Sequence, residues 1–444
     1  MGQISNWIWA GILCKYWSCG FFWQYRPWKT DYVKVLTNTN SDGINILHEA
    51  EKFINENLGL TLNKNKSGVF SVFNIEYLGY KFTKVNDKIE TIQNEQNKNI
   101  INYETFQTSA IQKIDQNYHL IADGILTWRD FTLLFENEEK KMYLPVEVVD
   151  FLNIYSNVTF SSDFFKFAKE KEIIITFYDK FGRYSGVFLP PYLNRSSKTL
   201  ISQVSIFLNE EKRLSIAKLI TEASCHNIRS NVRYYNKYLK DGRLYKSLKE
   251  FDEFILKIEK CESLENLFLI EAQGKEEYFS RFNIFLKDDS FDFENRNRRP
   301  PKDPINALIS FGNTILYQII AREIYKTGLD IRISFMHSPN KRNESLNLDI
   351  ADIFKPIIID RVIFTMINKK IINEKTHFES SENNGVYLNK EGKKIFLKYI
   401  DEKMYSKITV DNISVTYLGL IRREILNLLK YVEKDEPYKP FKYY

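Results

Sequence analysis

The hydrophobic pattern of this chain changes its period once, at the paired prolines Pro190 and Pro191. Before them, in residues 117–189, short apolar runs alternate with glycine-containing turns, a pattern typical of β-strands. One stretch within it, 161–169, favours a short helix. After them, in residues 200–444, apolar residues recur every three to four positions, which predicts helices. We therefore expect an α+β multidomain fold, with a small β-sheet domain followed by a mainly α-helical domain.

Length and charge set wide limits on the function. A chain of 444 residues exceeds the usual size of a single core, so two or three domains are expected. Its 15% aromatic and 43% hydrophobic content argue against disorder. The net charge of +6 is compatible with nucleic-acid binding but does not by itself imply it.

The cysteines and the N-terminal apolar segment bear on the compartment. The four cysteines lack C-x-x-C spacing, which argues against a zinc knuckle or a disulfide framework and favours the reduced cytoplasm; they are Cys14, Cys19, Cys225 and Cys261. The segment 7–23, WIWAGILCKYWSCGFFW, is at the lower length limit for a membrane span, is interrupted by Lys15 and has no basic residue before it. We expect it to be a packed or poorly ordered segment, with no membrane association.

Four residues form a candidate metal site. Asp349 and Asp352 are three positions apart, so they share one face of a helix, and His337 precedes them on a loop. Glu271, in LFLIEAQGKEEYF, is expected to open an earlier helical stretch that follows an apolar run, and it supplies a further carboxylate. Carboxylate oxygens with one imidazole suit Mg²⁺ or Mn²⁺. Taken singly, each residue is more simply a surface acid, a helix cap or a loop histidine.

Basic residues lie near these candidates. ENRNRRPPKDP precedes a helix expected to begin near Asn306, and guanidinium forks pair well with phosphate oxygens. The pattern predicts DNA contacts for Arg296, Arg298, Arg299, Lys302, Arg229 and Arg233. The competing interpretation pairs the first group with nearby acids, Asp288, Asp289, Asp292 and Glu294. Tyr278 is expected to pack in the core.

The N-terminal segment resembles the end of the palm of group II intron-type reverse transcriptases, in DYVKVLT, LGLTLNKNKS and the expected hairpin YLGYKF. Thr30 precedes Asp31 where that family has two adjacent acids, and too little chain lies upstream to supply another aspartate. We predict that residues 1–105 are a degenerate reverse-transcriptase-like remnant without activity. The polar stretch 84–115 is expected to be a linker, joined to the sheet domain through 106–116.

A second resemblance covers residues 118 to about 378. The phrases LIADGILTW, VTFSS, ITFYDKFGRYSGVFLP, IEAQGKEEYF, NRRPPKDPINALISFGNTILY, SFMHSPN and SLNLDIADIFKPIIIDR occur in the order found in the universal CRISPR-associated adaptation integrase, a metal-dependent DNA endonuclease that inserts new spacers into a CRISPR array. The resemblance implies that Glu271, His337 and Asp349 hold Mg²⁺ or Mn²⁺. Asp352 would orient these ligands or contact the metal transiently, and all four would be catalytic.

The resemblance also implies partners. The substrate would be double-stranded DNA, both the incoming spacer and the CRISPR repeat, joined by attack of a 3′-hydroxyl. The protein would form a homodimer through the sheet domain, and two dimers would be bridged by a small ferredoxin-like CRISPR adaptation subunit. Two alternatives remain open: a standalone metal-dependent nuclease on branched DNA in repair, and a non-catalytic DNA-binding scaffold.

Overall fold

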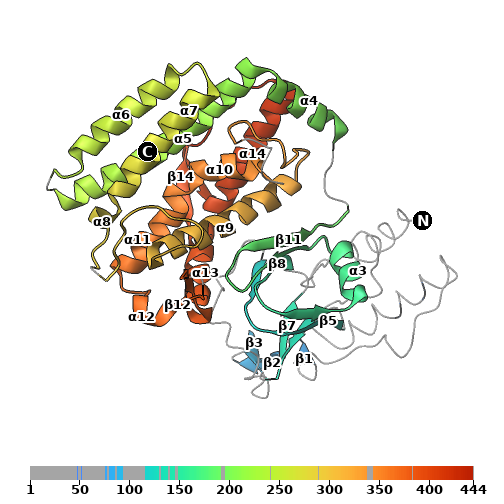
Figure 1. Cartoon of the computed structure of the whole chain (residues 1–444). Coiled ribbons are helices and arrows are strands. Elements are labelled where there is room, and N and C mark those ends of the chain that lie inside the picture. The colour runs from blue at the N-terminus through green and yellow to red at the C-terminus, as the bar shows by residue number, and fades with distance from the viewer. Residues whose placement is uncertain are drawn as a thin grey trace. The chain divides into compact units, whose positions relative to one another are not determined.

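The computed structural model describes residues 116–443 apart from gaps at 130–131, 139–140, 146–148, 192–195, 241, 289, 338–343 and 383 (Figure 1). Before residue 116 it describes only His48, Lys52 and three strands between residues 76 and 93. The chain divides into two compact units, residues 1–100 and 101–444. No helix of the described part is both long and apolar enough to cross a membrane. The segment 7–23 and the phrase DYVKVLT, which begins at Asp31, lie outside the described residues.

The first unit contains a three-stranded antiparallel sheet of β1 (Glu76–Tyr77), β2 (Tyr80–Val85) and β3 (Lys88–Gln93). The hairpin predicted from YLGYKF is confirmed, with Tyr77 opposite Tyr80. The predicted linker is wrong at its start, because β3 pairs with β2 along its whole length. The hydrogen bonds between paired strands are made by the backbone, so a segment of polar residues can form a strand. The polar composition of residues 88–93 therefore did not predict β3.

The sheet domain holds two four-stranded sheets with strands where the sequence predicts them. The first, in the order β11-β10-β8-β4, contains β4 (Gln116–Leu120), β8 (Val149–Ile154), β10 (Ile174–Tyr178) and β11 (Tyr184–Phe188). The second, in the order β7-β6-β5-β9, contains β5 (Gly124–Arg129), β6 (Thr132–Glu136), β7 (Lys141–Pro145) and β9 (Val158–Phe160).

A short helix completes the core of this domain. Helix α3 (Ser162–Glu170) confirms the helix predicted at 161–169, and the Ser161 hydroxyl caps it by accepting a hydrogen bond from the Phe164 N–H. Phe164 is fully buried in one apolar cluster with Leu126 and Leu152. The cluster therefore joins strands of both sheets to α3.

The second part of this unit is mainly helical, as predicted. Its longer helices are α4 (Ser197–Leu208), α5 (Glu210–Leu239), α6 (Tyr245–Glu259), α7 (Leu264–Ser280), α9 (Pro304–Tyr325), α10 (Leu346–Phe354), α11 (Arg361–Asn368), α13 (Lys390–Tyr405) and α14 (Tyr417–Lys434). Short elements are α8 (Phe282–Phe285), the π-helical turn η5 (Pro356–Asp360) and α12 (Glu374–His377). Two hairpins that the sequence analysis missed interrupt the helices: β12 (Phe378–Ser380) with β13 (Val386–Leu388), and β14 (Lys407–Val410) with β15 (Ile413–Thr416).

Helix α10 lies at the centre of the helical part and packs against α5 and α9. All nine of its residues are buried, which is typical of a helix surrounded by neighbours on every side. Helix α9 also packs closely against η5, which follows α10 in the chain: a Cβ added at Gly312 would lie 2.7 Å from Cγ2 of Ile359. The two acids of α10, Asp349 and Asp352, are therefore held inside a rigid, tightly packed frame.

A buried polar network joins the sheet part to the helical part. Asp401 of α13 contacts the His119 imidazole at 3.2 Å and accepts a hydrogen bond from Asn117 at 3.0 Å. The guanidinium of Arg322 on α9 donates to the Asn117 side chain at 2.7 Å and lies over the Phe151 ring. Buried polar groups are costly unless paired, so this network favours one docking geometry of the two parts.

Candidate active site

Asp349 fixes the position of His337. One carboxylate oxygen of Asp349 accepts hydrogen bonds from the backbone N–H groups of Phe335 and Met336, at 2.7 and 3.0 Å. The other accepts from the His337 N–H at 3.0 Å and from its ring Nδ1 at 2.7 Å. A carboxylate can only accept here, so Nδ1 carries the proton and Nε2 is directed elsewhere. Asp349 is completely buried, and its hydrogen bond outweighs the effect of burial and raises the pKa of His337.

Asp352 lies on the same face of α10 and faces Nε2 of His337, with Oδ2 4.0 Å away. Two lysines surround its carboxylate. Lys355 donates to Oδ1 at 2.5 Å, and Lys275 of α7 lies 3.4 Å from Oδ2. Burial opposes ionisation of Asp352, but the charges of Lys275 and Lys355 outweigh it and hold the pKa well below its usual range. Asp352 is therefore an anion at neutral pH.

Glu271 reaches the same cluster through Lys275. It lies in the middle of α7, which begins at Leu264, so the expectation that Glu271 opens a helix is wrong. The apolar run before it is part of the same helix rather than a separate element. Lys275 is one turn further along α7 and pairs with Glu271. The ammonium group of Lys275 thus lies between two carboxylates, those of Glu271 and Asp352.

The donors present suit a hard divalent cation. Within the described part of the chain, no three His, Cys, Asp or Glu side chains are close enough to form a ready-made cluster. The Lys275 cation occupies the place between Glu271 and Asp352, which shows that this position attracts positive charge. Two ligands of one Mg²⁺ or Mn²⁺ ion, each about 2.1 Å from it, lie roughly 3 to 4.2 Å apart. The 4.0 Å between His337 Nε2 and Asp352 Oδ2 agrees with that separation.

The contacts reverse the roles predicted for the two aspartates of α10. The sequence-based assignment made Asp349 the ligand and Asp352 the auxiliary acid. Both oxygens of Asp349 are occupied by three backbone N–H groups and the imidazole, so they do not face the cluster. Asp352 faces Nε2 of His337 instead. The geometry therefore favours Asp352 as the donor and Asp349 as the residue that orients the histidine.

Of four further side chains in or behind the cluster, the sequence analysis had assigned only one. Tyr278 is 2% exposed and its hydroxyl accepts from Asn231, which confirms the prediction of core packing. Asp360 was not singled out, although burial raises its pKa to about 7. Lys275 and Lys355 were also missed, yet the spacings Glu271–Lys275 and Asp352–Lys355 put each pair on one helix face and could have indicated them.

The predicted DNA contacts near α9 separate into two groups. Arg296 is a structural residue, because its guanidinium donates to Asn306 at 2.6 Å and to Ser310 at 3.0 Å. Burial lowers its pKa to about 10. Arg298, Arg299 and Lys302 are exposed instead.

The acids that could have paired with these arginines have other partners. Asp288 accepts from Ser290, and Asp292 accepts from Asn283. These two carboxylates therefore do not form the competing ion pairs that the sequence allowed. Phosphate contacts by Arg298, Arg299 and Lys302 remain a prediction, and Arg296 is a poor candidate for one.

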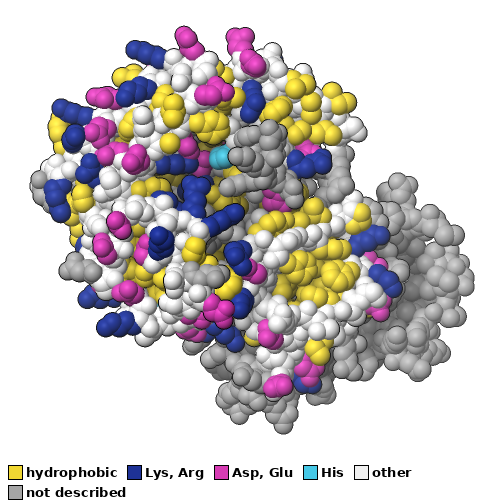
Figure 2. All heavy atoms as spheres, in the orientation of Figure 1, with side chains coloured by type: hydrophobic (Ala, Val, Ile, Leu, Met, Phe, Trp, Pro, Cys, Tyr) yellow, Lys and Arg dark blue, Asp and Glu magenta, His cyan; other side chains and the backbone are white. Residues whose placement is uncertain are grey.

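On α5, Arg229 and Arg233 differ in the same way. The Arg229 guanidinium pairs with Asp252 of α6 at 2.7 Å, whereas Arg233 is exposed. Lys and Arg side chains gather on the face of the helical part seen in Figure 2, beside a histidine. Positive charge is therefore available near the surface of this part of the molecule for a polyanion.

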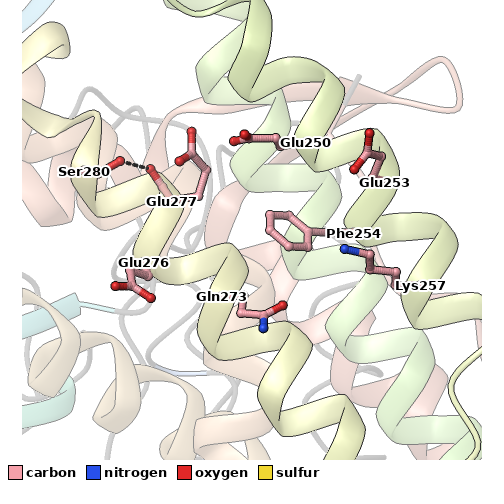
Figure 3. A pocket seen from close by; sticks show the side chains of 8 residues that line it. All are labelled: Glu250, Glu253, Phe254, Lys257, Gln273, Glu276, Glu277 and Ser280. Carbon is pink, nitrogen blue, oxygen red and sulfur yellow. Dashed lines mark hydrogen bonds between the residues drawn. The ribbon is translucent and has the colours of Figure 1, made fainter.

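A separate groove of about 560 Å³ lies between α6 and α7 (Figure 3). Its α7 side is formed by Gln273, Glu276, Glu277 and Ser280, which lie on the face of that helix opposite to Glu271. Hydrogen bonds from Arg281 and Ser247 outweigh burial and lower the pKa of Glu277. An anionic groove repels phosphodiesters, so the groove is not part of the candidate active site.

Comparisons with known proteins agree on one family. Residues 118–402 match the family model described as CRISPR associated protein Cas1. A CRISPR-associated endonuclease Cas1 of Thermodesulfovibrio yellowstonii is 38% identical over 328 residues, which cover 73% of this chain and 98% of the relative.

Solved structures agree with this match. The structure of a Cas1 protein from Thermotoga maritima is 33% identical, with a TM-score of 0.65, over 74% of this chain and all of that one. A casposase bound to integration product shares the fold at 19% identity, with a TM-score of 0.64, over 72% of this chain and 92% of that one. The family model and the Thermodesulfovibrio relative each cover most of the sheet domain and the helical part together. The chain therefore belongs to the Cas1 family of CRISPR-associated proteins.

Proposed function

We propose that this protein is a metal-dependent DNA endonuclease and integrase that inserts new spacer DNA into a CRISPR array. The observation that carries the proposal is the arrangement of His337, which Asp349 holds with Nε2 directed toward Asp352. Membership of a family whose relatives are named endonucleases supports it. The fold shared with a casposase bound to integration product is consistent with strand transfer.

The proposed ligands are Glu271, His337 and Asp352, with Asp349 as a positioning residue. A bound Mg²⁺ or Mn²⁺ would neutralise charge on the scissile phosphate and assist ionisation of the attacking hydroxyl. In strand transfer the 3′-oxygen of the incoming DNA forms a bond to phosphorus, and the bond from phosphorus to the departing 3′-oxygen breaks. The hydroxyl proton passes to solvent, and the departing oxygen takes up a proton. Lys275 and Lys355 add fixed positive charge beside the anionic group.

The proposed assembly is a homodimer formed through the sheet domain and bridged to a second dimer by a small ferredoxin-like CRISPR subunit. Ile125 and Tyr143 are 51% and 49% exposed on the sheet β7-β6-β5-β9. The pairing of Thr127 with Leu134 and of Leu134 with Tyr143 places them on one face. Figure 2 shows apolar side chains grouped on the strand-rich part. An exposed apolar face of this kind favours association with a second chain.

The test is integration of a labelled duplex with free 3′-hydroxyls into a plasmid that carries a CRISPR repeat, with the partner subunit and Mg²⁺ or Mn²⁺ present. We expect Glu271→Gln, His337→Ala and Asp352→Asn to reduce joining by about 100-fold or more, an effect typical of groups that act together. The matched control is Glu276→Gln, which removes an exposed carboxylate from the opposite face of α7 and should join DNA at the wild-type rate.

Each alternative gives a different result in the same assay. Cleavage of branched DNA that needs no partner subunit, without any joining, would favour a repair nuclease. Retained DNA binding, with neither cleavage nor joining under any divalent metal, would favour a scaffold. Full activity of Asp352→Asn together with Mn²⁺ affinity unchanged from the wild type would contradict the assignment of that residue as a ligand.

A further inference from the structure

The loop that carries His337 is buried although it forms neither helix nor strand. Between α9 and α10, three consecutive residues of the segment 330–337 are almost completely buried: Ser334, Phe335 and Met336. Backbone N–H and C=O groups that leave water need hydrogen-bond partners, and an irregular loop finds most of them in neighbouring elements. The partners of this loop therefore decide where the imidazole lies.

One side of the loop is held by α10 and the residue before it. The carboxylate of Asp349 accepts from the N–H groups of residues 335–337. The Ser345 hydroxyl donates to the carbonyl of Arg332 at 2.9 Å, and the Ser345 N–H donates to the carbonyl of Ile331 at 3.0 Å. These bonds tie the loop to the helix that carries both acids of the site.

Gln203, in the middle of α4, holds the other side of the loop and is fully buried. Its NH₂ group donates to the carbonyls of Asp330 at 3.0 Å and Ile333 at 2.8 Å, and its oxygen accepts from the Asp330 N–H at 2.8 Å. A buried amide is costly unless it is hydrogen-bonded, and here both donors and the oxygen are used. The chain before the loop also packs against α4: a Cβ added at Gly328 would lie 2.9 Å from Oγ1 of Thr199.

Arg213 of α5 holds the loop two residues before His337. Its Nε donates to the carbonyl of Phe335 at 3.0 Å, and its guanidinium lies over the Phe207 ring, 4.3 Å from the centroid. Phe335 is therefore fixed through its C=O by Arg213 and through its N–H by Asp349. The backbone that leads into the histidine is held from both sides.

We propose that Gln203 and Arg213 are positioning residues, which keep this loop in the conformation that directs the His337 imidazole toward Asp352. Removing their donors leaves buried carbonyls without these partners, and such groups move toward water or other donors because the unpaired state is costly. The inference rests on the proposed function, since the direction of Nε2 matters there for holding a metal ion. Outer residues that orient a metal-binding histidine change metal affinity about 10- to 100-fold.

The orientation of the imidazole is measured without metal. In EDTA the Nδ1 proton of His337, which Asp349 holds, should give a downfield NMR resonance, identified among the five histidines by its loss in His337→Ala. We expect Gln203→Leu and Arg213→Met to lose the resonance through exchange with water. Arg213→Lys keeps a donor for the carbonyl of Phe335 and should retain it.

The matched control is Thr199→Val on the same helix. It removes a hydrogen bond of 2.5 Å to Glu433 of α14, which is not a bond to the loop, and should keep both the resonance and the wild-type Mn²⁺ affinity. Gln203→Leu and Arg213→Met should each weaken Mn²⁺ binding in calorimetry by about 10- to 100-fold. Circular dichroism shows which variants are folded, and Arg213→Met, at a half-buried position, decides the matter where Gln203→Leu does not fold.

Two results would overturn the proposal. One is the resonance kept at full intensity in folded Gln203→Leu and Arg213→Met, and the other is its absence from the wild type. Mn²⁺ affinity equal to that of the wild type in both variants would also count against it. A wild type that shows the resonance but binds no Mn²⁺ would contradict the metal site alone, and the NMR comparison would still decide the roles of Gln203 and Arg213.

Discussion

Glu424 on α14 is buried in the core and anchors the C-terminal segment. It is 2% exposed and accepts hydrogen bonds from the Tyr438 hydroxyl at 2.5 Å and from the Phe441 N–H at 2.9 Å. Burial raises its pKa to about 7, although these two donors and the charge of Arg423 act in the opposite direction. The carboxyl therefore binds a proton more tightly in the folded chain than in the unfolded chain, where its pKa is about 4.3.

The sign of the effect on stability follows from this difference. Below the unfolded pKa both states are protonated, and Glu424 carries no penalty. As the pH rises toward 7 the unfolded chain releases its proton first, so the free energy of unfolding falls. Each unit of pKa corresponds to about 1.4 kcal/mol, so the loss approaches about 4 kcal/mol above pH 7.

Glu424→Gln tests this magnitude because the amide has the same shape and cannot ionise. Its oxygen can accept from the Phe441 N–H and its NH₂ group can donate to the Tyr438 hydroxyl. We expect similar stability of variant and wild type near pH 4.5, and a variant more stable by about 3.6 kcal/mol at pH 8. Urea unfolding followed by circular dichroism at the two pH values measures the difference, and other titrating groups cancel in the comparison.

The control is Glu436→Gln, an exposed acid in the same C-terminal segment, which should change stability by less than about 0.5 kcal/mol at either pH. A Glu424→Gln variant that is destabilised by the same amount at both pH values would refute the reasoning. That result would mean that the carboxylate is ionised in the folded protein and is stabilised by its two donors.

Further predictions concern packing and the proposed metal site. Gly312→Ala should destabilise the fold by about 1–3 kcal/mol, because the new methyl group overlaps η5, whereas Gly186→Ala meets nothing within 4 Å and should be close to neutral in urea unfolding. Asp349→Asn should weaken Mn²⁺ binding in calorimetry by about 10- to 100-fold, because the amide cannot satisfy the donors that orient the histidine. Mn²⁺ at 100 times its Kd should stabilise the wild type by about 2.7 kcal/mol in thermal unfolding, and a chelator should remove this stabilisation. Glu271→Gln should lose most of the stabilisation at the same Mn²⁺ concentration.

The sequence predicted the parts of the fold that depend on local pattern. The strands of the sheet domain and the helix at 161–169 follow from hydrophobic period and from the Ser161 cap. The hairpins β12–β13 and β14–β15 were missed because their strands have only three or four residues. So short a stretch does not establish the alternation of apolar and polar side chains that predicts a strand. The network of Asn117, His119 and Asp401 could not be predicted either, since Asp401 is more than 280 positions from the other two residues.

The candidate site shows why spacing alone could not assign the roles of its acids. Asp349 and Asp352 are one turn apart on one helix face, so the pattern treats them as equivalent. What separates them is the loop 335–337, whose backbone N–H groups converge on Asp349 and take up both of its oxygens. An acid saturated by backbone donors positions its neighbours, and an acid paired with lysine ammonium groups can exchange one of them for another cation. The division of labour in this site is therefore set by backbone N–H groups of the loop 335–337, which no side-chain pattern in the sequence reveals.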